Sequence, residues 1–274
     1  MGQVVHTLPE GEPVLGVTSL AGEIFLLRGK GRDQVEVYDV ITYCLLRCLT
    51  VPDLRSCADI ASCEHFKCVY ICDFVSECVH RLDVQATAYT RWTTKDRPTS
   101  LSVNVSHNVV VTCRVARKIK EFSSHGDLLR ELTLPDDVIT PWHTIQTREN
   151  EFVVCHGRRG DAVHRVCKMS ADGRHIVHSH GGQRGSGHGQ YNMPVHLALD
   201  DNEFVFVADL SNRRMRLLSP TLGRVRDIVS SDRLKWRPLR MCLDVQRMTL
   251  YVADNEWNET VRKWTSGRVV VFSV

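Results

Sequence analysis

Short runs of apolar residues recur along the whole chain, and segments rich in Gly, Pro, Asp, Asn and Ser separate them. In one such run Phe66, Cys68, Tyr70 and Cys72 occupy every second position, which is the pattern of one face of a β-strand. No stretch shows the apolar spacing of a helix over a useful length. The pattern therefore predicts an all-β protein.

Proline marks the start of a repeating unit. Of nine prolines, six stand just before a strand-like run, at separations of 39, 46, 43, 53 and 44 residues. Proline has no backbone N–H to donate to a sheet ladder, so it suits the entrance to a strand. The six are Pro13, Pro52, Pro98, Pro141, Pro194 and Pro238.

A second strand in each unit gives the same period. The residues that close it are 45, 40, 43, 53 and 45 positions apart: Arg28, Asp73, Cys113, His156, Asp209 and Asp254. Both markers share the one long gap, so we expect a longer, glycine-rich entry loop in the fifth unit. Third strands are expected at 34–40, 78–84, 119–122, 163–169, 213–218 and 268–274. Fourth strands are expected at 44–49, 89–93, 128–134, 175–178 and 224–229.

The sixth unit has no fourth strand after its third, and residues 3–8 can supply it. This N-terminal run ends at Pro9, as the fourth strand of the third unit ends at Pro135. A ring closed in this way has no free sheet edge. The repeat therefore predicts a six-bladed β-propeller of four-stranded blades, a single domain spanning residues 1–274, with its last blade closed by the N-terminal strand.

The fifth unit carries a specific motif. It reads GQRGSGHGQYNMP over residues 182–194, followed by LALDDNEFVFVAD and by Asn212-Arg213. This pattern resembles an NHL repeat. The resemblance is good in the sixth unit (LDVQRMTLYVADN) and recognisable in the second (VYICDFVSECVHRLD), whereas the other three units keep only the strand periodicity. WD propellers fit less well because the chain has no Trp-Asp dipeptide.

The resemblance implies a function. NHL propellers are best known at the C-terminus of tripartite-motif ubiquitin ligases, where they bind proteins or RNA. The present sequence has no RING or B-box zinc pattern, so any ligase catalysis would need a domain outside it. We expect a non-catalytic protein-interaction module, a scaffold or a substrate-recognition propeller, with RNA binding as the alternative.

Charge and composition limit the cellular location and the kinds of partner that we expect. The formal net charge of +3 is nearly balanced, so the charge of the whole chain does not argue for nucleic acid. No apolar run approaches the ~18 residues of a membrane span. The first residues lack the basic and apolar regions of a signal peptide. We expect a cytoplasmic, monomeric propeller that needs no cofactor and binds no membrane.

Cysteine is abundant, and seven of the eleven lie between Cys44 and Cys78. Zinc modules usually carry two matched cysteine pairs, and this segment contains no Cys-x-x-Cys. We therefore expect reduced, buried or half-buried thiols, as intracellular proteins have, and no metal.

Several other residues are of types found in catalytic or binding sites, but their positions in the repeat favour structural roles. Asp73, Asp209 and Asp254 each close a second strand, where a carboxylate can accept backbone N–H bonds in the next turn. The glycine-rich stretch has no lysine and leads into a strand, so it is not a phosphate-binding P-loop. A histidine cluster could hold a metal, although a solvated loop is the simpler interpretation: His175, His178, His180 and His188.

Basic residues cluster at the turns after the second strand in units three to five. Equivalent turns of neighbouring blades lie side by side, so these residues are expected to form a continuous positive surface that binds an acidic protein or RNA phosphates. Scattered, solvated charges are the alternative. The candidate binding residues are Arg114, Arg117, Lys118, Arg158, Arg159, Arg213, Arg214 and Arg216, and Lys120 lies beside them.

Catalysis has little support in the sequence. Neither Gly-x-Ser-x-Gly nor His-Glu-x-x-His occurs. A metal-dependent propeller hydrolase remains a remote alternative, and its inward-facing ligands cannot be assigned from the repeat.

Overall fold

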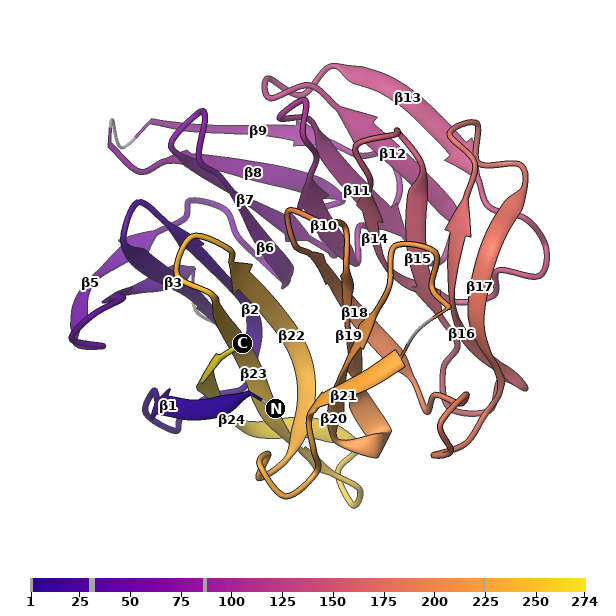
Figure 1. The fold of residues 1–274 in the computed structure, drawn as a ribbon. Helices are drawn as coiled ribbons and strands as arrows, with labels where there is room; N and C mark the ends of the chain where they lie inside the picture. Colours follow the sequence, from indigo (N-terminus) through magenta and orange to yellow (C-terminus); the bar gives the residue numbers. More distant parts are fainter. Residues whose placement is uncertain (1, 30–32, 86–87, 224) are drawn as a thin grey trace.

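The computed structural model consists of six antiparallel four-stranded sheets arranged as the blades of a propeller (Figure 1). It describes residues 2–29, 33–85, 88–223 and 225–274. The first strand of every blade contacts the first strands of both neighbouring blades, so these six strands surround the central channel. The predicted fold class is confirmed.

Blades 1 to 3 follow the chain in order. Blade 1 contains β2 (Val14–Leu20), β3 (Glu23–Arg28), β4 (Gln34–Asp39) and β5 (Leu45–Thr50). Blade 2 contains β6 (Cys57–Cys63), β7 (Cys68–Asp73), β8 (Cys78–Asp83) and β9 (Tyr89–Thr93). Blade 3 contains β10 (Ser100–Val103), β11 (Val109–Cys113), β12 (Lys118–Phe122) and β13 (Leu128–Thr133).

Blades 4 to 6 complete the ring. Blade 4 contains β14 (Pro141–Gln146), β15 (Phe152–His156), β16 (Val163–Met169) and β17 (Ile176–Gln183). Blade 5 contains β18 (Pro194–Leu199), β19 (Val205–Asp209), the short 3₁₀ helix η1 (Leu210–Asn212), β20 (Arg214–Leu218) and β21 (Val225–Val229). Blade 6 contains β22 (Arg237–Asp244), β23 (Thr249–Asn258), β24 (Lys263–Ser273) and β1 (Gln3–Thr7).

The N-terminal strand closes the ring, as predicted. β1 lies antiparallel to β24 and pairs Gln3 with Ser273 and Thr7 with Val270. The N–H of Leu8 then donates to the carbonyl of Val269 at 2.9 Å. Both termini consequently lie on blade 6 (Figure 1).

The structure differs most from the sequence prediction in two segments. β17 continues to Gln183, so Gly181 and Gly182 belong to a strand and not to the entry loop of blade 5. β23 and β24 extend well beyond their predicted bounds as a long hairpin, on which Trp257 and Trp264 pack edge to face. The predicted strand 224–229 is observed from Val225, because Arg224 lies outside the described residues.

The core consists of six apolar clusters, one between each pair of neighbouring blades. The two faces of each sheet therefore both bury apolar side chains, which explains the largely apolar strand sequences. Of the cysteines, all are free thiols. Nine are buried or half-buried, as expected, but Cys44 and Cys48 are exposed. No helix in the described part of the chain is long and apolar enough to cross a membrane.

The strand order gives the propeller two distinct ends. In each blade the turn between the first and second strands lies at one end, here called the 1–2 end, together with the turn between the third and fourth. The turn between the second and third strands lies at the opposite end, here called the 2–3 end, with the connections between blades.

Candidate functional site

The central channel is narrowed by a ring of equivalent residues, one from each blade. In five blades the ladder between the first and second strands shifts register directly before this position, as a β-bulge does. Blade 3 reaches the same position without a shift. The ring residues are Gly16, Asp59, Ser100, His143, His196 and Arg240.

Four of these residues meet at the channel axis. Arg240 Nε lies 3.2 Å from Asp59, and His196 Nε2 lies 3.3 Å from Asp59 Oδ2. The rings of His143 and His196 have centroids 3.8 Å apart. Arg240 also donates to the carbonyls of Ala58 and Thr99 at 2.8 and 3.2 Å. Blades 2, 3, 4, 5 and 6 are thus joined by one buried polar cluster, here called the channel plug.

The surroundings of the plug fix its charges. Burial alone would raise the pKa of Asp59, but Arg240 and His196 outweigh it and hold that pKa below its ordinary value. Burial lowers the pKa of His143 well below its usual range and also lowers the pKa of His196. The plug is therefore one carboxylate and one guanidinium with two neutral imidazoles.

The plug also offers a test of the metal hypothesis, because ligand atoms of Asp59, His143 and His196 lie within 4.8 Å of one another. Two observations argue against a cation. The charge of Arg240 already neutralises the same carboxylate. Metal binding through Nε2 would also place a proton on each Nδ1, and both Nδ1 atoms are buried without a partner among the described residues. Metal-bound histidines normally donate that N–H to an acceptor.

A second convergent group, Asp73, Cys78 and His80, fits a metal no better. Asp73 already accepts backbone N–H bonds from the turns around it, and His80 Nδ1 lies 2.7 Å from the hydroxyl of Tyr89. Burial raises the pKa of Cys78 to about 11, so its sulfur is a thiol in the metal-free protein and a metal would have to displace that proton.

On the 1–2 side of the plug the channel widens into a cavity of about 220 Å³. Small hydroxyl side chains in its wall satisfy one another or nearby carbonyls. Thr18 donates to Ser62 at 2.9 Å, and Ser102 donates to the carbonyl of Thr144 at 2.8 Å. This cavity has no arrangement of a nucleophile beside a base among the described residues.

A much larger cavity, about 910 Å³, opens at the 1–2 end between blades 5 and 6. We call it the blade 5–6 groove. Its walls combine apolar residues with polar and charged ones, and its volume falls within the range of roughly 300–1,000 Å³ typical of ligand pockets. Its apolar lining consists of Phe204, Phe206, Leu217, Ile228, Leu243, Val245, Met248 and Val274.

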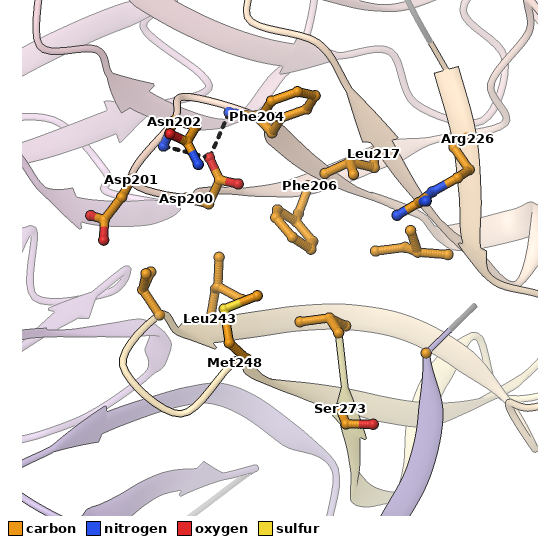
Figure 2. Close-up of a pocket in the computed structure, with 14 residues that line it drawn as sticks. Asp200, Asp201, Asn202, Phe204, Phe206, Leu217, Arg226, Leu243, Met248 and Ser273 are labelled. Atoms are coloured by element: carbon orange, nitrogen blue, oxygen red, sulfur yellow. Dashed lines mark hydrogen bonds between the residues drawn. The ribbon is translucent and has the colours of Figure 1, made fainter.

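Charged groups stand at the two ends of this groove. Figure 2 shows the Asp200–Phe204 turn on one side, Leu243 and Met248 opposite, and Arg226 pointing into the space from β21. Asp200 accepts the N–H groups of Asn202 and Phe204 at 2.9 and 2.8 Å, which fixes the turn. No acceptor for the Arg226 guanidinium is found among the described residues.

The closing strand helps to build the groove. The N–H of Gly2 donates to the carbonyl of Ile228 at 2.8 Å, and Gly2, Ser273 and Val274 belong to the lining. The N-terminus thus links blade 6 to the outermost strand of blade 5. The geometry of the groove consequently depends on ring closure.

The predicted basic residues lie on or next to three neighbouring turns at the 2–3 end, with Lys118 in β12 and with Arg214 and Arg216 in β20. Only Arg158 and Arg159 extend well into solvent there, with side chains 65% and 75% exposed. Arg117 binds the carbonyl of Pro135 at 2.7 Å, and Lys118 pairs with Glu131 at 2.6 Å. Arg114 is half-buried.

The basic residues of blade 5 are internal supports. Arg216 is only 1% exposed and pairs with Asp227 at 2.8 Å. Arg214 pairs with Asp209 at 2.8 Å, and Arg213 donates to backbone carbonyls of 231–236. The prediction that Arg213, Arg214 and Arg216 belong to a continuous exposed surface is therefore wrong, because their guanidinium groups donate hydrogen bonds to acceptors inside the fold. A binding role for the eight basic residues stays a prediction.

The same contacts explain the glycine-rich motif. The carbonyls of Gly187 and Gln190 accept from Arg214 and Arg216, and the N–H of Gly187 donates to Gln190 Oε1. At Gly185 a Cβ atom would lie against Gln190 Oε1, so a larger residue there would displace the side chain of Gln190. The motif is a structural unit, and the arginines are part of it.

The strand-closing aspartates have the structural role predicted for them, but among the described residues backbone donors in the next turn are found only for Asp73, which accepts from the N–H groups of Val75 and Ser76. Asp254 accepts from the N–H groups of Lys235 and Trp236, and Asp209 accepts from Asn192. In both cases the donors lie in the loop that enters the blade. The four clustered histidines belong to neither convergent group of potential ligands in the described chain. Two of them, His178 and His180, lie in β17.

No protein-family model and no curated protein matches the chain. Solved structures do resemble it. Hydrazine synthase from Kuenenia stuttgartiensis is 13% identical, over 96% of this chain and 97% of that chain, with a TM-score of 0.64. Virginiamycin B lyase from Staphylococcus aureus is 9% identical, over 97% of this chain and 98% of that chain, with a TM-score of 0.64. A protein of unknown function from Bacteroides caccae is 13% identical, over 88% and 85%, with a TM-score of 0.64.

At these identities the likeness establishes the six-bladed propeller fold alone. The neighbours are propellers of other kinds and not NHL proteins specifically. Sequence reasoning missed both the channel plug and the blade 5–6 groove. The plug had a signal, because Ser100, His143, His196 and Arg240 each stand two residues after a blade-opening proline.

Proposed function

We propose that this propeller is a protein-interaction module without catalytic chemistry of its own, and that it receives an apolar segment of its partner in the blade 5–6 groove. The proposal rests on the groove itself, which is the larger of the two cavities described and in which more than half of the lining residues are apolar. Largely apolar pockets with a few placed polar groups are the usual form of a binding site.

The lining also favours binding over catalysis. Among the described residues the groove contains no histidine, cysteine or lysine, and no hydrogen bond joins the hydroxyl of Ser273 to the carboxylates of Asp200 and Asp201. Asp200 is engaged by backbone N–H groups, and Asp201 lies 3.3 Å from Arg148. These groups suit recognition of a partner's polar atoms.

A polypeptide segment matches the groove better than a uniformly apolar molecule. The apolar floor lies between carboxylates at Asp200 and Asp201 and the guanidinium of Arg226. A peptide can present apolar side chains between charges of opposite sign. The NHL-like motif of blade 5 agrees with this proposal, because NHL propellers of tripartite-motif ligases recognise proteins. A role in substrate recognition for a ubiquitin ligase is part of the same proposal.

The experiment uses short peptides selected on the wild-type chain from a displayed random library. Affinities are measured by fluorescence anisotropy for wild type, Met248→Glu and Val115→Glu. Met248 lies in the groove and is 57% exposed, whereas Val115 lies at the 2–3 end and is 71% exposed. A buried carboxylate at 248 should weaken binding by about tenfold or more. Val115→Glu should bind as wild type does.

Equal affinity for wild type and Met248→Glu would contradict the proposal. RNA binding is the alternative, and it predicts retention of random-sequence RNA that weakens steeply as salt rises. Among the eight predicted basic residues, only Arg158 and Arg159 are largely exposed, so few of them are available to contact RNA phosphates. A protein partner is therefore better supported than RNA.

A further inference from the structure

Arg114 stands apart from the other arginines of its face. It directly follows β11 at the 2–3 end, and its guanidinium lies over the ring of Trp142 at 4.3 Å from the centroid. Its side chain is half-buried. Within the described part of the chain, no hydrogen bond or ion pair from this guanidinium is found.

The contrast with its neighbours is sharp. Arg117, in the same turn, binds two carbonyls and Asp136. Arg158 approaches Asp161, and Arg159 pairs with Glu259. Arg213, Arg214 and Arg216 are likewise taken up by carbonyls or carboxylates. Every other predicted binding arginine therefore has an acceptor inside the protein.

The charges around Arg114 are positive. Burial lowers its pKa, and the positive charges of Arg240 and Arg158 lower it further, with no carboxylate acting in the opposite sense. The charge of Arg240 is balanced by Asp59 inside the plug. The nearest contact of Arg158 with Asp161 is a long one, 3.6 Å. A partly buried cation beside like charges is unfavourable unless an anion compensates it.

Trp142 holds the guanidinium of Arg114 in a position that suits binding of such an anion. The indole covers one face of the guanidinium, and its Nε1 donates to the carbonyl of Gly157 at 3.0 Å, so the ring is fixed. A guanidinium held against an aromatic ring keeps its N–H edge free, and that edge matches the two oxygens of a carboxylate or phosphate.

We propose that Arg114, held against Trp142, binds the phosphate or carboxylate group of a small molecule at the 2–3 end of the central channel. The site lies at the opposite end of the propeller from the blade 5–6 groove and does not depend on the protein-binding proposal. Its ligand is an oxyanion, because the guanidinium edge supplies donors and positive charge but no acceptor.

The test is calorimetric titration of the full chain with inorganic phosphate and, separately, with succinate, both at constant ionic strength. The variants are Arg114→Gln and, as a matched control, Arg159→Gln. Arg159 lies next to Arg158 and is exposed, but its partner is Glu259. Thermal melting with and without each anion provides a second readout, because an anion that binds the folded chain raises its melting temperature.

We expect saturable binding of at least one anion by wild type and by Arg159→Gln. Loss of the charge-assisted hydrogen bonds in Arg114→Gln should weaken that binding by about tenfold or more. Whichever anion binds more tightly identifies the group. Equal affinity in wild type and Arg114→Gln would overturn the proposal, as would an anion effect that sodium chloride reproduces at equal ionic strength.

Discussion

Arg240 of blade 6 contacts Asp59 of blade 2 across the channel, at 3.2 Å, although blade 1 lies between these blades. Blade 1 contributes Gly16 at the same level of the ring. A Cβ atom there would lie 2.8 Å from Ile60 Cγ2, so a side chain does not fit. The ion pair thus joins blades that share no sheet contact.

This pair leads to a stability prediction. Asp59→Ala leaves a buried guanidinium without its carboxylate and should lower the free energy of unfolding by about 3–5 kcal/mol. Urea denaturation of the purified chain measures the loss. The double change Asp59→Leu with Arg240→Met removes both charges and should be less destabilising than the single change. A single variant as stable as wild type would show that the pair does not hold the plug together.

Stability should also fall in acid through His156. Burial and the charge of Arg165, which donates to His156 Nε2 at 2.8 Å, lower the pKa of this histidine to about 4. In the unfolded chain the same group takes up a proton below about pH 6.5. The unfolded state therefore binds more protons between these values, and stability falls as the pH drops through this window, by on the order of 3 kcal/mol.

The variant His156→Gln separates this effect from the protonation of carboxylates. Glutamine keeps an acceptor for Arg165 but does not titrate. Unfolding free energies at pH 7.5 and pH 5 should differ less for the variant than for wild type. Equal differences in the two proteins would contradict the assignment.

Removal of residues 1–9 should strongly destabilise the ring, because it exposes the edge of β24 and removes Leu8, which is fully buried between blades 6 and 1. Thermal melting measures the effect. The milder change Leu8→Ala keeps the strand pairing and should cost about 2–5 kcal/mol. An unchanged melting temperature after the deletion would mean that β1 does not close the ring in solution.

Charge reversal should have opposite consequences at two arginines of the 2–3 end. Arg214→Glu places a second carboxylate against buried Asp209 and should cost about 3–5 kcal/mol. Arg159→Glu affects only an exposed pair and should change stability by less than about 1 kcal/mol. Chemical denaturation of both variants tests this. Binding losses caused by Arg214→Glu can therefore be interpreted only alongside its stability.

The repeat could be predicted from the sequence because each of its signals is local. A blade-opening proline, an apolar run and a strand-closing Asp recur at nearly constant spacing, and they locate the strands of Pro194 and Asp209 within a few residues. The length of β23 could not be predicted in this way. Its extension beyond Asp254 has no apolar alternation and is held by pairing with β24.

The candidate site could not be predicted from the sequence because its geometry depends on contacts between residues that are far apart along the chain. The exposure of Arg216 depends on whether Asp227 and the carbonyl of Gln190 reach it, which only the folded loop decides. The groove arises between two blades and needs the N-terminal Gly2 to meet Ile228. The sequence shows which residues stand two positions after a blade-opening proline. It does not show that Asp59 and Arg240 pair across the channel.

Hydrogen–deuterium exchange of the full chain with a selected peptide tests most directly whether the blade 5–6 groove is the binding site. Peptide binding in the groove should slow exchange in the Asp200–Phe204 turn, along β21 and around Met248, and should leave the turns of the 2–3 end unchanged. Protection confined to the turns that carry Val115 and Arg158, with none at the groove, would contradict it.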